Sequence, residues 1–213
     1  MRPEHTIQTM MREWAAVPMR AYLHAYHRLQ IEGRENLPRD GSFILISNHA
    51  SHLDAVCLQA ALPVSRIHQV FSAVASDYFS VGLPRVALAA GVVNAVPFAR
   101  HVHVRQSLSL CRQILATPGN ILILFPEGTR STTGEVGPFR PGITSLVTGT
   151  GLPVVPCAIR GAFAAWPKGG LLPKPTSLRL VIGTPRRYPQ HASGHQSNHQ
   201  IADELRDAVR ALL

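Results

Sequence analysis

Two polar side chains with catalytic potential, His49 and Asp54, stand between two apolar runs of the chain. Residues 43–46 predict a buried strand and residues 55–62 predict a helix, so the pair lies at a strand-to-helix turn. On one regular helix a spacing of five would put the two side chains about 140° apart, but a turn lets Asp54 reach the imidazole. An imidazole held by a carboxylate is a general base. Asp54 has an alternative interpretation as the N-cap of the helix.

A second loop with chemical potential occupies residues 125–131, F-P-E-G-T-R-S. It follows a run of apolar residues, 121–125, that predicts a strand buried on both faces. The loop offers hydroxyl and backbone donors, and Arg130 offers a two-pronged cation that matches phosphate. Glu127 beside an anion site needs an arginine or a substrate hydroxyl as its partner. A turn with a solvated Glu–Arg pair is the alternative. If the strands are parallel, this loop and His49 lie at the same edge of the sheet.

Strand and helix patterns alternate along the rest of the chain. Predicted strands are 43–46, 67–73, 92–98, 121–125, 153–159 and 178–182, and predicted helices are 55–62, 77–90, 103–116, 143–148 and 198–213. Alternation of this kind predicts an α/β fold: a three-layer domain with a mostly parallel central sheet flanked by helices. Residues 126–142 form a polar loop too long for a simple connection. We divide the chain into an N-terminal amphipathic helical segment, 1–32, and one domain, 33–213.

The N-terminal segment predicts a helix over residues 6–29, with Pro18 as a kink or a second start. The predicted apolar side carries Ile7, Met11, Trp14, Ala21, Tyr22, Ala25 and Leu29, and the opposite side carries Arg12 and Arg20. Such a helix packs on the domain, the interpretation we favour, or lies on an anionic lipid surface.

The composition narrows the class of protein and its partners. The apolar content is 46% and the net charge is +9, which excludes disorder and favours anionic partners such as phosphorylated substrates or acidic lipid. No nucleic-acid-binding motif is present. The chain has no transmembrane-length apolar stretch and no secretory signal at its N-terminus.

Other candidate groups are better explained as structural. The three cysteines, Cys57, Cys111 and Cys157, read as reduced core residues of a cytosolic protein. Cys57 is close in sequence to His49, but its apolar surroundings favour core packing over a nucleophile. Residues 191–199 carry three histidines at a spacing of four, and the glycine and serines among them favour a solvated loop over a metal site.

The two loops together resemble one family. N-H-x-S-x-x-D at residues 48–54, followed by F-P-E-G-T-R-S at 125–131, is similar to the 1-acylglycerol-3-phosphate acyltransferase family of glycerolipid acyltransferases. V-P-F-A-R at 96–100 resembles the family's second block, and L-P-V-V-P at 152–156 resembles its fourth. Gly91 lies farther before Arg100 than the glycine of the family's second block.

The resemblance implies an acyltransferase that moves a fatty acyl group from acyl-CoA or acyl carrier protein to the hydroxyl of a lysophospholipid. The default acceptor is 1-acylglycerol-3-phosphate, which gives phosphatidic acid. His49 is then the catalytic base and Asp54 orients it. The resemblance assigns binding of the acceptor to Arg100, Glu127, Gly128, Thr129 and Arg130. No metal or redox cofactor is implied, and the thioester is a co-substrate.

The same resemblance implies a peripheral protein at the cytoplasmic face of an anionic membrane, acting in phospholipid synthesis. Alternative acceptors are glycerol 3-phosphate, another lysolipid or lyso-ornithine lipid. Two other classes remain open, a lipid-binding module without turnover and a hydrolase that gives the acyl group to water. Thiol release measured with and without a lysophospholipid separates these classes.

Overall fold

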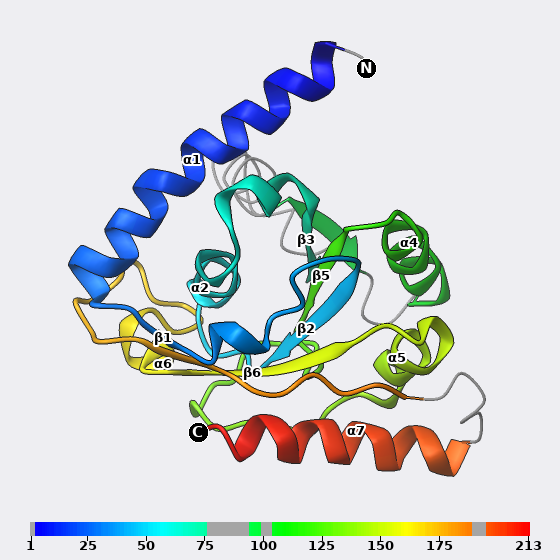
Figure 1. The fold of residues 1–213 in the computed structure, drawn as a ribbon. Coiled ribbons are helices and arrows are strands. Elements are labelled where there is room, and N and C mark those ends of the chain that lie inside the picture. The colour runs from blue at the N-terminus through cyan, green and yellow to red at the C-terminus, as the bar shows by residue number, and fades with distance from the viewer. Residues whose placement is uncertain (1–2, 76–93, 99–103, 189–194) are drawn as a thin grey trace.

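The fold is built on one seven-stranded sheet. The structure is a computed structural model that describes residues 3–75, 94–98, 104–188 and 195–213 (Figure 1). The strands are β1 (Gln30–Glu32), β2 (Phe43–Ser47), β3 (Val70–Ala75), β4 (Ala95–Phe98), β5 (Ile121–Leu124), β6 (Val154–Arg160) and β7 (Arg179–Ile182). Their order across the sheet is β1-β7-β6-β2-β5-β3-β4.

Most strands of the sheet run in the same direction. β6, β2, β5, β3 and β4 are parallel neighbours, β7 is antiparallel to β6, and β1 is parallel to β7. The mostly parallel sheet predicted from the sequence is therefore confirmed. β1 is a three-residue edge strand whose short, polar sequence gave no strand signal. It lies in the N-terminal segment 1–32, directly after the predicted helix 6–29.

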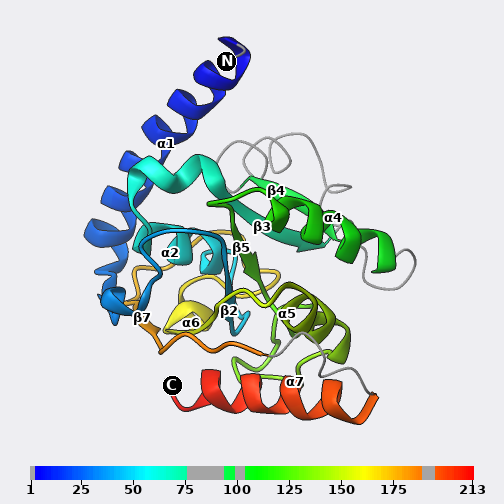
Figure 2. The ribbon, with the colours of Figure 1, turned by 45° about the vertical axis from the view of Figure 1, so that its right-hand side comes forward.

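Helices cover both faces of the sheet, which gives the predicted three layers. They are α1 (Pro3–His27), α2 (Asp54–Ala61), α4 (Val104–Ala116), α5 (Thr144–Thr150), α6 (Ala162–Ala165) and α7 (His195–Arg210). α1, α2 and α6 lie on one face, and α4, α5 and α7 lie on the other (Figures 1 and 2). In β2, Phe43 and Leu45 point into the first core, while Ile44 and Ile46 point into the second. This alternation explains why the central strands are apolar throughout.

Two predicted boundaries need correction. The predicted strand 67–73 begins only at Val70, because Val64–Gln69 forms a 3-10 helix. The closing helix begins at His195, so His195 and His199 lie on a helix and not in the predicted loop. Ile201, in the second turn of this helix, is buried in the second core. The predicted helix 77–90 lies outside the described residues.

The side of α1 that contacts the domain agrees only in part with the predicted one: Tyr22 packs on the core as expected, but Trp14 and Arg20 lie differently. The helix is continuous through Pro18. Leu23 is fully buried, and the Arg20 guanidinium donates to the carbonyl oxygens of Gln59 (3.3 Å) and Leu62 at the end of α2. Trp14, which we placed on the apolar contact side, is 76% exposed. Arg20, which we placed on the side opposite the apolar one, faces the protein instead. It does so because its guanidinium can satisfy the free carbonyl groups at the C-terminus of α2.

The N-terminal half of α1 extends away from the sheet (Figure 1). Among the α1 residues whose burial is described, the buried Leu23 and the partly buried Ala16, Met19 and Tyr22 pack in the first core. Within the described part of the chain, none of the helices combines the length and the apolar character needed to cross a bilayer.

Candidate active site

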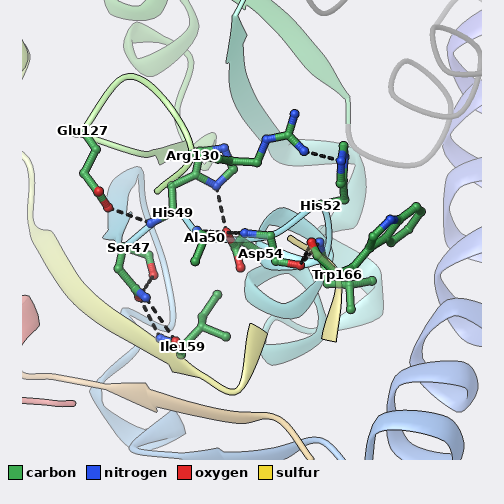
Figure 3. Close-up of polar contacts among 12 residues, drawn as sticks. Ser47, His49, Ala50, His52, Asp54, Glu127, Arg130, Ile159 and Trp166 are labelled. Atoms are coloured by element: carbon green, nitrogen blue, oxygen red, sulfur yellow. Dashed lines mark hydrogen bonds and ion pairs between the residues drawn. The ribbon is translucent and has the colours of Figure 1, made fainter. Parts of the chain in front are cut away.

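The two loops with chemical potential meet at one edge of the sheet, as the sequence predicted. β2 and β5 are parallel neighbours, so the loops that follow them leave the sheet side by side. The backbone N–H of Ser131 donates to the carbonyl oxygen of His49 at 2.7 Å. The backbone N–H of His49 donates to Glu127 Oε1 at 2.8 Å (Figure 3). The two segments are therefore joined by hydrogen bonds in both directions.

His49 and Asp54 form the pair expected of a general base. His49 Nδ1 lies 2.8 Å from Asp54 Oδ2, and the same oxygen accepts the backbone N–H groups of Ala50 (2.7 Å) and Ser51 (2.8 Å). Asp54 is the first residue of α2, and the helix is preceded by Leu53. The N-cap interpretation is therefore wrong, because the carboxylate holds the turn before the helix and not the N–H groups of its first turn.

The environment of His49 fixes which ring nitrogen is chemically useful. Asp54 is fully buried, whereas the His49 side chain is 22% exposed. A carboxylate beside Nδ1 keeps the proton on that atom, so Nε2 is the atom that accepts a proton. The ring also stacks on Phe125, with centroids 4.1 Å apart and planes 17° apart. The imidazole is thus held from two directions while one edge remains accessible.

Glu127 joins three backbone segments of the site. Its Oε1 accepts the N–H of His49, and its Oε2 accepts the N–H of Gly137 at 3.0 Å. The carboxyl group is buried, and this burial raises the pKa of Glu127, although the two N–H donors favour its charged form. From the sequence we expected an arginine or a substrate hydroxyl as its partner. The described contacts are instead to backbone N–H groups.

The rest of the second loop has a geometry that requires glycine. Gly128 has φ +72°, and a Cβ there would lie 2.6 Å from Arg140 Nε, so a larger residue would clash in a backbone conformation that L-residues rarely adopt. Thr129 is exposed. The Arg130 guanidinium contacts Nε2 of His52 (Figure 3). Gly128, Thr129 and Arg130 therefore lie on the same side of the sheet edge as His49 and Asp54, whereas Arg100 lies outside the described residues.

Sequence reasoning missed Asn48, the residue that positions His49 from behind. Its Nδ2 donates to the carbonyl oxygen of Ile159 (3.0 Å), and its Oδ1 accepts the Ile159 N–H (2.8 Å). The side chain is buried, and its two hydrogen bonds replace those that the backbone of a neighbouring strand would make to Ile159. Its place in the motif was the only available signal, because the partner lies 111 residues away.

The segment after β6 is a third part of the site that sequence reasoning missed. The carbonyl oxygen of Trp166 accepts the Ser51 hydroxyl (2.8 Å) and the His52 N–H (3.3 Å). The His52 and Trp166 rings lie 4.9 Å apart. The His49 turn is therefore held by the loops that follow β5 and β6, the two neighbours of β2.

The cysteines do not supply a nucleophile. All three are buried, and burial raises the pKa of the Cys57 thiol and that of Cys111, the latter to about 11. The prediction that they are reduced core residues agrees with this placement. Among the residues that the structure describes, no cluster of three histidine, cysteine or acidic side chains could hold a metal ion.

The chain has clear relatives among known proteins. The family described as Acyltransferase matches residues 28–160. The chloroplastic 1-acyl-sn-glycerol-3-phosphate acyltransferase BAT2 of Brassica napus is 30% identical over 177 residues, which are 81% of this chain and 48% of the relative. The corresponding protein LPAT1 of Arabidopsis thaliana is also 30% identical, over 81% of this chain and 46% of its own length. This chain spans about half the length of these curated relatives.

A solved structure resembles the whole chain. The crystal structure of the 1-acyl-sn-glycerophosphate (LPA) acyltransferase PlsC from Thermotoga maritima superimposes with a TM-score of 0.71 at 25% sequence identity. The match covers 100% of this chain and 82% of the other.

Proposed function

Because this chain belongs to the acyltransferase family, we propose that it moves a fatty acyl group from a thioester to the hydroxyl of a lysophospholipid. Its membership confirms the resemblance to the 1-acylglycerol-3-phosphate acyltransferases that the motifs indicated. The proposed acceptor is 1-acylglycerol-3-phosphate, which gives phosphatidic acid, because that substrate stands in the names of the similar plant and Thermotoga maritima proteins. The proposed donor is acyl-CoA or acyl carrier protein.

The observation that carries this proposal is the His49–Asp54 pair, with 2.8 Å between Nδ1 and Oδ2. In the proposed reaction, Nε2 of His49 takes the proton of the acceptor hydroxyl as its oxygen attacks the thioester carbonyl carbon. The new C–O bond forms, the C–S bond breaks, and the leaving thiolate takes the proton from the imidazolium. Asp54 stabilises that imidazolium. The enzyme forms no covalent intermediate, so the reaction requires neither a serine nor a cysteine nucleophile.

The proposed acceptor site is the loop that carries Gly128, Thr129 and Arg130. A guanidinium binds phosphate with two parallel hydrogen bonds, and the chain's net charge of +9 favours an anionic substrate. The role of Glu127 in binding the glycerol phosphate stays a prediction, as does that of Arg100. For Glu127, the contacts to His49 and Gly137 support a role in holding the two loops together.

We further propose that the protein works as a peripheral protein at the cytoplasmic face of an anionic membrane. Its proposed acceptor is a membrane lipid, and its positive charge suits acidic headgroups. The exposed Trp14 and Val17 on α1 support contact with the lipid surface.

The test is thiol release from acyl-CoA, measured with and without 1-acylglycerol-3-phosphate. We expect release that depends on the acceptor, together with phosphatidic acid identified by mass spectrometry. Release without acceptor would indicate a hydrolase, and no release from either acyl-CoA or acyl carrier protein would indicate a binding module. His49→Ala is expected to abolish transfer and to leave the protein folded.

A matched control is His68→Ala. His68 lies in the 3-10 helix Val64–Gln69, outside the loops of the site, and also has a carboxylate neighbour, with 3.9 Å between its Nδ1 and Glu13 Oε1. We expect this variant to retain activity. A folded, active His49→Ala protein would contradict the proposed mechanism.

A further inference from the structure

The loop after α6 exposes two large apolar side chains at its tip. Leu171 is 89% exposed and Leu172 is 78% exposed, more than any other large apolar residue whose burial the structure describes. Two leucines side by side in water form an exposed apolar surface, which is favourably covered because burial removes apolar area from water.

Internal hydrogen bonds hold this loop in a fixed shape. The Lys174 N–H donates to the carbonyl oxygen of Ala165 at 2.8 Å, which closes the loop at its base. The Trp166 indole N–H donates to the carbonyl oxygen of Gly170 at 2.8 Å, and the Gly170 N–H donates to that of Pro167 at 3.0 Å. The leucines are therefore presented outward by a closed loop and do not fold back onto the domain.

The loop stands at the same sheet edge as the proposed active site. It follows β6, which runs parallel to β2, and the carbonyl oxygen of Trp166 accepts hydrogen bonds from Ser51 and His52. On its other side it contacts α1, because the Tyr26 hydroxyl donates to the carbonyl oxygen of Pro173 at 3.2 Å. The loop therefore lies between the catalytic turn and the helix that carries the exposed Trp14.

A shallow hollow of about 560 Å³ continues the apolar surface inward from the two leucines. Its lining is mainly apolar and includes Phe163, Pro167, Leu171, Leu172 and Lys174. Lys168 and Lys174, the only lysines of the chain, flank the leucines on either side, and both are exposed. An apolar tip between two amines matches the layered chemistry of a lipid surface, with acyl chains below and anionic headgroups above.

We propose that the loop 166–174 inserts Leu171 and Leu172 into an anionic membrane surface, while Lys168 and Lys174 contact its headgroups. The inference rests on the proposed function in one respect: the benefit of membrane docking is access to a lysophospholipid acceptor, which lies in the membrane. Docking at this loop brings the edge that carries His49 to the lipid, so the acceptor reaches the base without leaving the membrane. An acidic protein partner would be favoured by a wider basic surface around the leucines, and the loop offers only its two lysines.

Vesicle binding of the full chain tests the proposal without any turnover. The probe is sedimentation with vesicles of phosphatidylcholine and phosphatidylglycerol, in the absence of acyl donor. We expect Leu171→Ser/Leu172→Ser to weaken binding by about tenfold or more. The matched control is Leu110→Ser/Leu213→Ser, which removes two leucines that are 38% and 40% exposed elsewhere on the surface, and we expect it to bind like the wild type.

The charges are tested separately. We expect Lys168→Gln/Lys174→Gln to weaken binding to the anionic vesicles by roughly tenfold and to change binding to pure phosphatidylcholine vesicles little. Leu171→Ser/Leu172→Ser should transfer acyl groups normally to a short-chain, water-soluble acceptor and slowly to an acceptor embedded in vesicles.

Unchanged vesicle affinity of the leucine variant would overturn the proposal, and so would an equal loss in the control variant. Loss of acyl carrier protein binding with unchanged vesicle binding would assign the loop to a protein partner instead. If the wild type transfers no acyl group to any acceptor, the proposed function fails, but the vesicle measurement still decides this inference.

Discussion

Asp54→Asn keeps the size of a side chain on which the whole catalytic turn depends, and it removes only the charge. The carboxylate stabilises the imidazolium that forms when His49 takes the hydroxyl proton, and it keeps the proton of the neutral ring on Nδ1. An amide does neither reliably. We expect kcat to fall by about 10²–10⁴-fold, the usual contribution of general base catalysis, with little change in the KM of either substrate.

The same substitution should lower stability by an amount that the contacts define. One oxygen of the fully buried Asp54 accepts three N–H groups, from His49, Ala50 and Ser51. A hydrogen bond to a charged group is worth about 1.5–3 kcal/mol and a neutral one about 0.5–1.5 kcal/mol. Three such changes cost roughly 3 kcal/mol, which lowers Tm by roughly 6–12 °C in a domain of this size.

His49→Ala provides the comparison that separates the two effects. It should lose at least as much activity as Asp54→Asn but only one of the three hydrogen bonds, so its Tm should fall much less. Because Asp54 acts through His49, the double variant His49→Ala/Asp54→Asn should be no less active than His49→Ala alone. Thiol-release kinetics and thermal melts measure both quantities. Activity of Asp54→Asn within threefold of the wild type (roughly, since base catalysis is worth far more), or multiplied losses in the double variant, would refute the reasoning.

Three further predictions concern substrate binding, pH and backbone geometry. Arg130→Ala is expected to raise the KM of the acceptor more than that of the acyl donor, and an unchanged acceptor KM in steady-state kinetics would place the phosphate elsewhere. His27 is buried and burial lowers its pKa, so its contribution to stability should be present above its ordinary pKa of about 6.5 and be lost as the pH falls below that value. Thermal melts on both sides of that pH should show a weaker dependence for His27→Gln, whereas the exposed His24→Gln should behave like the wild type. Gly33 and Gly41 share a φ of +76°, but a Cβ at Gly33 would lie 2.1 Å from a carbonyl oxygen of β7, while nothing lies within 4 Å at Gly41. In denaturant unfolding, Gly33→Ala should therefore lose at least about 2 kcal/mol more than Gly41→Ala, and equal losses would contradict the clash.

The sequence allowed the central architecture to be predicted because its strands carry strong local signals. The apolar run of β5 (Ile121–Leu124) fits only a strand covered on both faces, and the helices between such runs force parallel pairing. Parallel pairing then placed the loops after β2 and β5 at one edge, and the contact between His49 and Glu127 confirms that step.

What the sequence did not reveal depends on distant backbone groups. The partners of Asn48 and Ser51 lie 111 and 115 residues away, and a carbonyl oxygen leaves no trace in the sequence. The inward position of Arg20 was missed for the same reason, since its acceptors are the carbonyl oxygens that end α2. A helical periodicity argument places every arginine on the solvent-exposed side, so it cannot predict an arginine that faces the protein to bind backbone carbonyl groups.

The amide of Asn48 allows the chain to leave the sheet one residue early. When a chain leaves a sheet, the backbone N–H and C=O of the neighbouring strand normally lose their hydrogen-bond partners. Here the Asn48 side chain satisfies both the N–H and the C=O of Ile159. Only a primary amide offers a donor and an acceptor side by side in this way. Because its backbone need not pair with β6, the chain at His49 can turn away from the edge of the sheet. The imidazole is thereby presented to substrates, and no backbone hydrogen-bonding group of Ile159 is left unpaired.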